Sequence, residues 1–148
     1  MAQHAIAAVV DGDQIDLLRP IEKSADVRIL TSKDEEVLEI FRHSSAHLMA
    51  AAVMEIFPEA KYGIGPPIDG GFFYDFALDT PFTPEDLQNI EDKMKELARK
   101  KIPFEREEIS KSKAISEFQK LAQTFKEELV LEKGDEVVSC YRLGSFYD

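Results

Sequence analysis

Short apolar runs separated by turn residues open the chain. They cover residues 5–10, 15–18 and 27–30. Gly12 and Asp13 separate the first two runs and Pro20 follows the second, an arrangement that predicts short β-strands joined by tight turns. Because three short strands make a poor core by themselves, residues 1–31 are predicted to be one part of a small β-rich module.

A helical pattern of apolar residues follows this β-rich part. Ser32 and Glu35 have the spacing of a capping box, which predicts a helix that begins near residue 33. Pro58 ends the helix near residue 57. Weak helix formers at 43–47 leave open a kink or a break in its middle. The apolar positions of this helix are Val37, Ile40, Phe41, Leu48, Ala52 and Ile56.

Strands and helices then alternate to the end of the sequence. Gly-Pro and Asp-Gly groups between residues 61 and 76 predict a hairpin with a structured loop. Thr83 as N-cap and Pro84 as the first helical residue predict a helix to about Lys100, with an apolar stripe of Leu87, Ile90, Met94 and Leu97. We further expect strands at 104–109, 137–142 and 146–148, and helices at 111–122 and 124–132. This is the pattern of an α+β fold, with antiparallel strands packed on helices.

Composition and charge narrow the classes of function. The 148 residues are 44% hydrophobic and 32% charged, as in folded globular domains. The net charge is −11 and each third of the chain is acidic, which argues against a non-specific nucleic-acid binder. The basic cluster at 99–101 is interpreted as compensation of a helix dipole. No apolar run approaches a membrane span, and the single Cys140 points to a reducing cytoplasm.

Two histidines supply the first candidate chemistry. His43 and His47 are four residues apart on the predicted helix, which places both imidazoles on one face. Ser44 stands where a zinc-protease motif needs glutamate, so that chemistry is excluded. Two histidines leave a zinc site two ligands short, and such a pair alone is more often a partly buried polar patch than a functional site.

Other reactive side chains have ordinary structural interpretations. In the aromatic run that ends at Tyr74, three adjacent rings cannot all face inward along a strand. We expect Tyr74, with its polar hydroxyl, to be the ring that is exposed or lines a cavity. Cys140 is interpreted as core packing and Lys126 as a surface lysine of a helix. The glycines at 63–71 lack the spacing of phosphate-binding loops.

Two motifs taken together resemble one enzyme family. Residues 43–48 are His-Ser-Ser-Ala-His-Leu, and residues 64–75 are Ile-Gly-Pro-Pro-Ile-Asp-Gly-Gly-Phe-Phe-Tyr-Asp. In this order they resemble the N-terminal region of threonyl-tRNA synthetases, and the resemblance covers essentially the whole chain. It implies a partial TGS module, which is ubiquitin-like, at 1–31. At 32–148 it implies the editing domain shared with alanyl-tRNA synthetases.

The resemblance also implies a reaction and the residues for it. In that family the editing domain hydrolyses seryl-tRNA(Thr) made in error, and its site residues match His43, His47, Tyr74, Lys126 and Asp148 of this chain. The paired histidines of the family face the aminoacyl ester and the terminal adenosine. A histidine or a lysine would activate the attacking water, and Lys126 or Tyr74 would stabilise the oxyanion.

Parts of the family pattern lie outside this sequence. In the family a cysteine and a histidine follow the matching aspartate, whereas this sequence stops at Asp148. His43 and His47 are therefore half of a possible metal quartet, and we expect no tightly bound zinc and no other cofactor. The family's ATP site, its zinc and the contacts of its homodimer belong to a catalytic core that this sequence does not contain.

The partner implied by the resemblance is the acceptor end of tRNA(Thr) that carries serine. The net charge of −11 keeps an alternative open, in which the chain is a non-catalytic module that docks the acceptor end or a partner protein.

Overall fold

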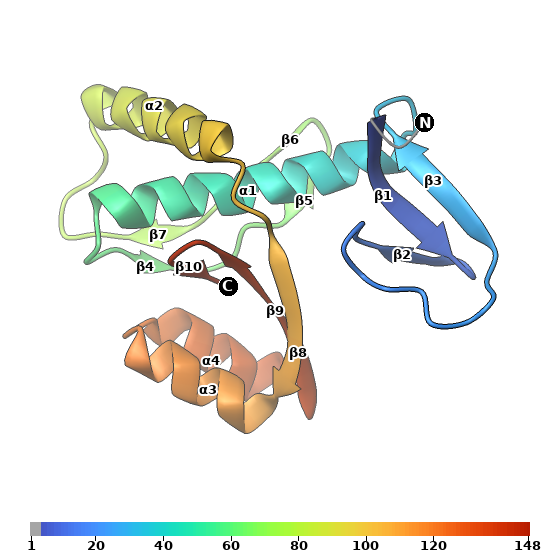
Figure 1. Ribbon diagram of the computed structural model, residues 1–148. Helices are drawn as coiled ribbons and strands as arrows, with labels where there is room; N and C mark the ends of the chain where they lie inside the picture. The colour runs from blue at the N-terminus through green and yellow to red at the C-terminus, as the bar shows by residue number, and fades with distance from the viewer. Residues whose placement is uncertain (1–3) are drawn as a thin grey trace. The chain divides into compact units, whose positions relative to one another are not determined.

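The computed structural model describes residues 4–148, which group into two compact units (Figure 1). One unit ends at His43 and the other begins at Ser44. The chain consists of α-helices and short antiparallel strands, so the predicted α+β class is confirmed. Within the described residues, no helix has both the length and the apolar character that crossing a membrane requires.

A three-stranded antiparallel sheet forms most of the first unit. Its strands are β1 (Ala5–Val10), β2 (Asp13–Ile15) and β3 (Val27–Thr31), in the order β2-β1-β3. Ala7 and Leu30 of this sheet are buried together with Val37. The second predicted strand is present and pairs with the first across a tight turn, but it covers 13–15 and not 15–18. The carboxylate of Asp16 accepts a 2.8 Å hydrogen bond from the backbone N–H of Leu18 and turns the chain there.

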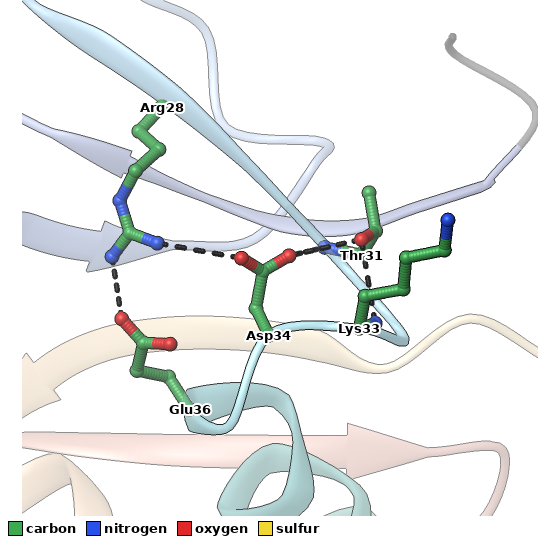
Figure 2. A network of polar contacts seen from close by, with 5 residues as sticks. All are labelled: Arg28, Thr31, Lys33, Asp34 and Glu36. Carbon is green, nitrogen blue, oxygen red and sulfur yellow. Dashed lines mark hydrogen bonds and ion pairs between the residues drawn. The ribbon is translucent and has the colours of Figure 1, made fainter.

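Helix α1 (Glu36–Ile56) begins later than the predicted residue 33. Figure 2 shows the reason: the Asp34 carboxylate accepts hydrogen bonds from the N–H and the hydroxyl of Thr31, at 2.7 and 2.9 Å. These bonds form a tight turn before the helix, so the helix does not start from a capping box at 32–35. The Arg28 guanidinium, 2.5 Å from Glu36 and 3.7 Å from Asp34, then ties β3 to the first helical turn.

Helices α1 and α2 (Pro84–Lys100) contribute to the main core of the second unit. Helix α1 is continuous, without a break at 43–47, and its buried residues after Ser44 include Ala46, Ala50, Ala51, Ala52 and Val53. Ile90 and Leu97 of α2 join the same core. The predicted cap is confirmed, because the Thr83 hydroxyl accepts a 3.2 Å hydrogen bond from the N–H of Asp86.

Two apolar residues on the predicted apolar faces of these helices are exposed and not buried. Phe41 of α1 and Leu87 of α2 are 66% and 59% exposed. Both lie on sides of their helices that are turned away from the buried clusters, so the apolar faces are narrower than the sequence pattern suggests.

The predicted hairpin between residues 61 and 76 consists of two nested pairs of strands. The outer pair is β4 (Lys61–Tyr62) with β7 (Phe76–Ala77), and the inner pair is β5 (Pro67–Ile68) with β6 (Gly71–Phe72). The Gly63 N–H donates to the Asp75 carbonyl at 2.8 Å, and the Asp75 N–H donates to the Ile64 carbonyl at 3.0 Å. These two bonds extend the outer pair to Asp75, the residue after Tyr74.

A second sheet, covered by two helices, makes up the remainder of the second unit (Figure 1). Its strands are β8 (Glu105–Ser110), β9 (Val137–Leu143) and β10 (Phe146–Tyr147), in the order β10-β9-β8. Helix α3 (Lys111–Lys120) packs on β8, β9 and α4 (Thr124–Lys133), and α4 also contacts β4. The predicted packing role of Cys140 is confirmed, since it is buried among Ile109, Ala114, Phe118 and Tyr147, where burial raises the pKa of its thiol.

Candidate functional site: a buried carboxylate with three donors

Asp148 is fixed at the end of the β9–β10 hairpin. Its backbone N–H donates to the carbonyl of Tyr141 at 2.9 Å, and its own carbonyl accepts from the N–H of Tyr141 at 2.5 Å. These bonds continue the strand pairing beyond the pair of Tyr147 with Arg142. The hairpin therefore determines where the Asp148 carboxylate lies.

Three side chains from separate parts of the second unit meet at this carboxylate. Nε2 of His47, in α1, lies 3.1 Å from Oδ2 of Asp148. The hydroxyl of Tyr74 donates to the same oxygen at 2.7 Å. Lys126 of α4 forms an ion pair with the other carboxylate oxygen, Oδ1. We call these four residues the Asp148 cluster; all four are among the site residues that the family resemblance implies.

The Asp148 cluster is withdrawn from water. The side chains of His47, Lys126 and Asp148 are 7%, 8% and 10% exposed. Burial by itself raises the pKa of Asp148, but the hydrogen bond from His47 and the positive charge of Lys126 outweigh it and lower the pKa to about 2. The carboxylate is therefore ionised at neutral pH and balances the charge of the Lys126 ammonium.

Lys126 lies inside the fold and not on its surface. Its Nζ atom is 5.8 Å from the ring centroid of Tyr62 and 5.6 Å from that of Tyr74. Aromatic ring faces attract a cation, and Asp148 supplies the opposite charge. The interpretation of Lys126 as a surface lysine is wrong, because α4 turns this position toward β4 and away from solvent.

Tyr74 is buried, and its neighbour Phe73 is the exposed ring, at 8% and 38% exposure. Of the two alternatives expected for Tyr74, an exposed ring is wrong, because its hydroxyl donates to Asp148 inside the fold; a ring that lines a cavity stays a prediction. Gly65 makes room for the ring: a Cβ atom at Gly65 would lie 2.1 Å from Cδ2 of Tyr74. Burial, and next the negative charge of Asp148, raise the pKa of Tyr74, so its hydroxyl remains a proton donor.

The two histidines of α1 have different surroundings. His47 is 6% exposed, and its ring lies edge-on to those of Tyr141 and Phe146, with centroids 5.5 and 6.0 Å away. His43 lies one helical turn earlier in α1, as predicted, and its side chain is exposed. The structure thus orients His47 toward Asp148, whereas a role for His43 stays a prediction.

Two further buried residues support the cluster, and sequence reasoning overlooked both. Gln123 and Tyr62 are each 2% exposed. The N–H of Tyr62 donates to Oε1 of Gln123 at 3.1 Å, and the hydroxyl of Tyr62 donates to the carbonyl of Tyr147, the residue before Asp148. Glutamine is usually a surface residue and Tyr62 belongs to a two-residue strand, so no local pattern marks either one.

The cluster is suited to acid–base chemistry on a polar bond. A carboxylate held against one imidazole nitrogen orients the ring and stabilises positive charge on it. The Lys126 ammonium and the Tyr74 hydroxyl both lie beside the Asp148 carboxylate. There they place a positive charge and a proton donor that can stabilise negative charge as it develops on a substrate. Residues 4–148 contain no group of three or more His, Cys, Asp or Glu side chains arranged to hold a metal ion.

Comparison with known proteins finds relatives of this chain in one class of proteins, the amino acid–tRNA ligases. No family model matches the sequence, but curated proteins align with it from end to end. These relatives are threonine–tRNA ligases, which are also called threonyl-tRNA synthetases. The ligases of Citrifermentans bemidjiense and Geobacter sp. strain M21 are each 48% identical over 148 residues, which is 100% of this chain and 23% of each ligase.

A third relative extends this agreement. The ligase of Maricaulis maris is 44% identical over 149 residues, again 100% of the chain and 23% of the ligase. The chain belongs to the threonyl-tRNA synthetase family, and it spans about a quarter of the length of these relatives.

Proposed function

We propose that this chain is the editing region of a threonyl-tRNA synthetase and hydrolyses the ester that links serine to tRNA(Thr). The Asp148 cluster carries this proposal, because it gathers a histidine, a lysine and a tyrosine around one buried carboxylate. In this proposal residues 1–31 are part of a TGS module and residues 32–148 form the editing domain.

The reaction meets a physical need of an enzyme that charges tRNA with threonine. Serine lacks one methyl group of threonine, and a binding pocket gains only ~1–3 kcal/mol of selectivity from such a group. A separate site that hydrolyses the seryl ester supplies the missing selectivity, since a small site rejects the larger threonine by its size.

The proposed mechanism starts from the pair of His47 and Asp148. The imidazole takes a proton from a water molecule as that water attacks the ester carbonyl carbon, and the Asp148 carboxylate stabilises the imidazolium that results. The carbonyl oxygen becomes an oxyanion in the tetrahedral intermediate. When the intermediate collapses, the bond to the ribose oxygen breaks, and that oxygen leaves as a hydroxyl with the proton that the imidazolium returns.

Lys126 and Tyr74 stabilise the oxyanion in this scheme. Both are already desolvated beside Asp148, so little reorganisation is needed when charge develops. Because the pKa of Tyr74 is raised by burial and by Asp148, Tyr74 acts as a hydrogen-bond donor and never as the base. His43, exposed on the preceding turn of α1, is assigned to the terminal adenosine or to the ester.

Single-turnover hydrolysis of seryl-tRNA(Thr) and threonyl-tRNA(Thr) by the chain tests the proposal. We expect the seryl ester to be hydrolysed faster. Substitution His47→Ala should lower this rate about 10²-fold or more, the usual contribution of a general base. His43→Ala should lower it as well, while His4→Ala, which changes an exposed histidine outside the cluster, should have no effect. Equal rates for all four proteins would refute the assignment.

The same preparation distinguishes the non-catalytic alternative. A module that only docks the acceptor end would bind tRNA(Thr) with an affinity that falls steeply with salt and would leave both esters intact. Charging of tRNA with threonine, the use of ATP and dimer formation are assigned to the parts of a complete synthetase beyond this chain, in a cytoplasmic enzyme.

A further inference from the structure

Gln123 has an unusual combination of position and burial. It is the N-cap residue of α4, yet its side chain makes no capping hydrogen bond to that helix. Serine, threonine, aspartate and asparagine are the usual N-cap residues because their side chains bind the first free N–H groups. The buried amide of Gln123 is therefore used elsewhere.

The Gln123 amide binds the backbone of β4 and of Ala60, the residue just before β4, with its two polar atoms. Its Nε2 donates to the carbonyl of Ala60 at 3.1 Å, and its Oε1 accepts from the N–H of Tyr62 at 3.1 Å. These bonds join the N-cap residue of α4 to a segment more than sixty positions earlier. The preceding Ala122 has a φ of +53°, a conformation disfavoured for alanine, at the point where the N–H of Gln123 donates to the carbonyl of Phe118 at 2.9 Å and α3 ends.

The amide thereby fixes the place of Lys126. Lys126 follows Gln123 by three residues in the first turn of α4, so anchoring the cap residue anchors the turn that carries the lysine. The same Tyr62 whose N–H binds Gln123 lies under Nζ of Lys126. Through its hydroxyl, Tyr62 also binds the carbonyl of Tyr147, next to Asp148.

We propose that Gln123 is a positioning residue of the Asp148 cluster, whose two hydrogen bonds to the backbone at 60–62 hold Lys126 against the Asp148 carboxylate. This inference rests on the proposed function for its effect on hydrolysis. The geometric part, the placement of Lys126, is independent of any substrate.

The test replaces the amide and follows two properties of the whole chain. Gln123→Met keeps the volume of the side chain and removes both hydrogen bonds, and Gln123→Asn keeps the amide but shortens its reach. Carbon-13 NMR of the Asp148 carboxyl group reports whether Lys126 stays beside it. Single-turnover and steady-state hydrolysis of seryl-tRNA(Thr) report the catalytic effect.

Matched controls separate positioning from general destabilisation. Gln119→Ala removes an exposed glutamine of α3 that donates to Glu127 of α4 at 2.6 Å, so it loosens the same helix pair without touching β4. Ile109→Val removes a methyl group from the buried cluster of Ile109, Ala114, Phe118, Cys140 and Tyr147 and lowers stability without removing either side-chain hydrogen bond of Gln123.

We expect both Gln123 variants to raise the measured pKa of Asp148 by about one unit, because the nearby positive charge moves away. They should lower kcat for the seryl ester about tenfold or more, with KM changed less than about twofold, since an oxyanion donor acts in the transition state. The two control variants should leave the pKa and kcat unchanged.

If a Gln123 variant folds and its Asp148 pKa is unchanged, the positioning role is overturned, whatever the rate of hydrolysis. If the pKa rises in the variants but the unsubstituted chain hydrolyses no seryl ester, the positioning role stands and the proposed function fails. If the pKa rises and kcat does not fall, Gln123 positions Lys126 but Lys126 takes no part in the reaction.

Discussion

The ion pair between Asp148 and Lys126 should contribute strongly to stability, and a double-mutant cycle measures how much. Asp148→Asn keeps the shape of the side chain and removes its charge, which leaves the buried Lys126 ammonium without the opposite charge. Lys126→Met removes the opposite charge with little change in length. Each single substitution leaves one buried charge without its partner, whereas the double variant leaves none.

The magnitude follows from the pKa of Asp148. A shift from the ordinary value of 3.8 to about 2 stabilises the charged carboxylate in the folded state by about 2 kcal/mol. Breaking a buried pair from one side typically costs about 3–5 kcal/mol, because the remaining charge stays desolvated. We therefore expect each single variant to lose about 3 kcal/mol of unfolding free energy, and the double variant to lose about 1–2 kcal/mol less than their sum, because the hydrogen bond from His47 also contributes to the lowered pKa of Asp148.

Urea unfolding at pH 7, followed by circular dichroism, measures all four corners of the cycle. The exposed pair of Lys95 with Glu91 on α2, whose atoms are 2.6 Å apart, gives a matched control cycle, and solvent screening should make its coupling much smaller. If the losses of unfolding free energy at Asp148 and Lys126 are strictly additive, the two charges do not interact in the folded protein. That result would refute the Asp148 cluster.

Three other predictions follow from the same geometry. The pKa of Asp148 in the folded state lies below its unfolded value of 3.8. About 2 kcal/mol of stability is therefore present above pH 4 and is lost as the pH falls toward 2. Acid unfolding should show this loss of stability, and the Asp148→Asn variant should lack this pH dependence. Gly65→Ala should displace the Tyr74 ring and lower the melting temperature, because its Cβ would lie 2.1 Å from that ring, whereas Gly71→Ala, with nothing within 4 Å, should not. After dialysis against a chelator the chain should hold no stoichiometric zinc, since the two helix histidines alone leave a zinc site two ligands short; elemental analysis decides, and one zinc per chain would contradict the expectation.

Local signals in the sequence predicted an element correctly where the hydrogen bonds that start it lie between residues close together in the sequence. The helix at 84–100 begins at its predicted cap, because Thr83 and Asp86 make their hydrogen bonds within one turn. The start of α1 was misplaced because several polar residues at 31–36 can all form turns, and Asp34 forms one with Thr31. Which of these turns forms depends on the neighbouring strand β3, and the pattern of residues at 31–36 does not show where that strand lies.

The candidate site depends on contacts between distant parts of the second unit. The residues alone suggested a surface position for Lys126 and a ring of Tyr74 that is exposed or lines a cavity. The exposed positions are wrong for both, because Asp148 binds these side chains inside the fold. The family resemblance pointed to all three residues without showing how they meet. Gln123 escaped notice because its partners lie at 60–62, far away in the sequence.

The central claim is that the Asp148 cluster hydrolyses a seryl ester, and the most direct test compares two lysines of the same helix. Lys126→Met removes the buried ammonium, and Lys133→Met removes an exposed one at the other end of α4. The measurement is the single-turnover rate of seryl-tRNA(Thr) hydrolysis by each protein, at a temperature where circular dichroism shows both to be folded. We expect Lys126→Met to lower the rate about 10²-fold or more and Lys133→Met to match the unsubstituted chain. Equal rates for the two variants would contradict the central claim.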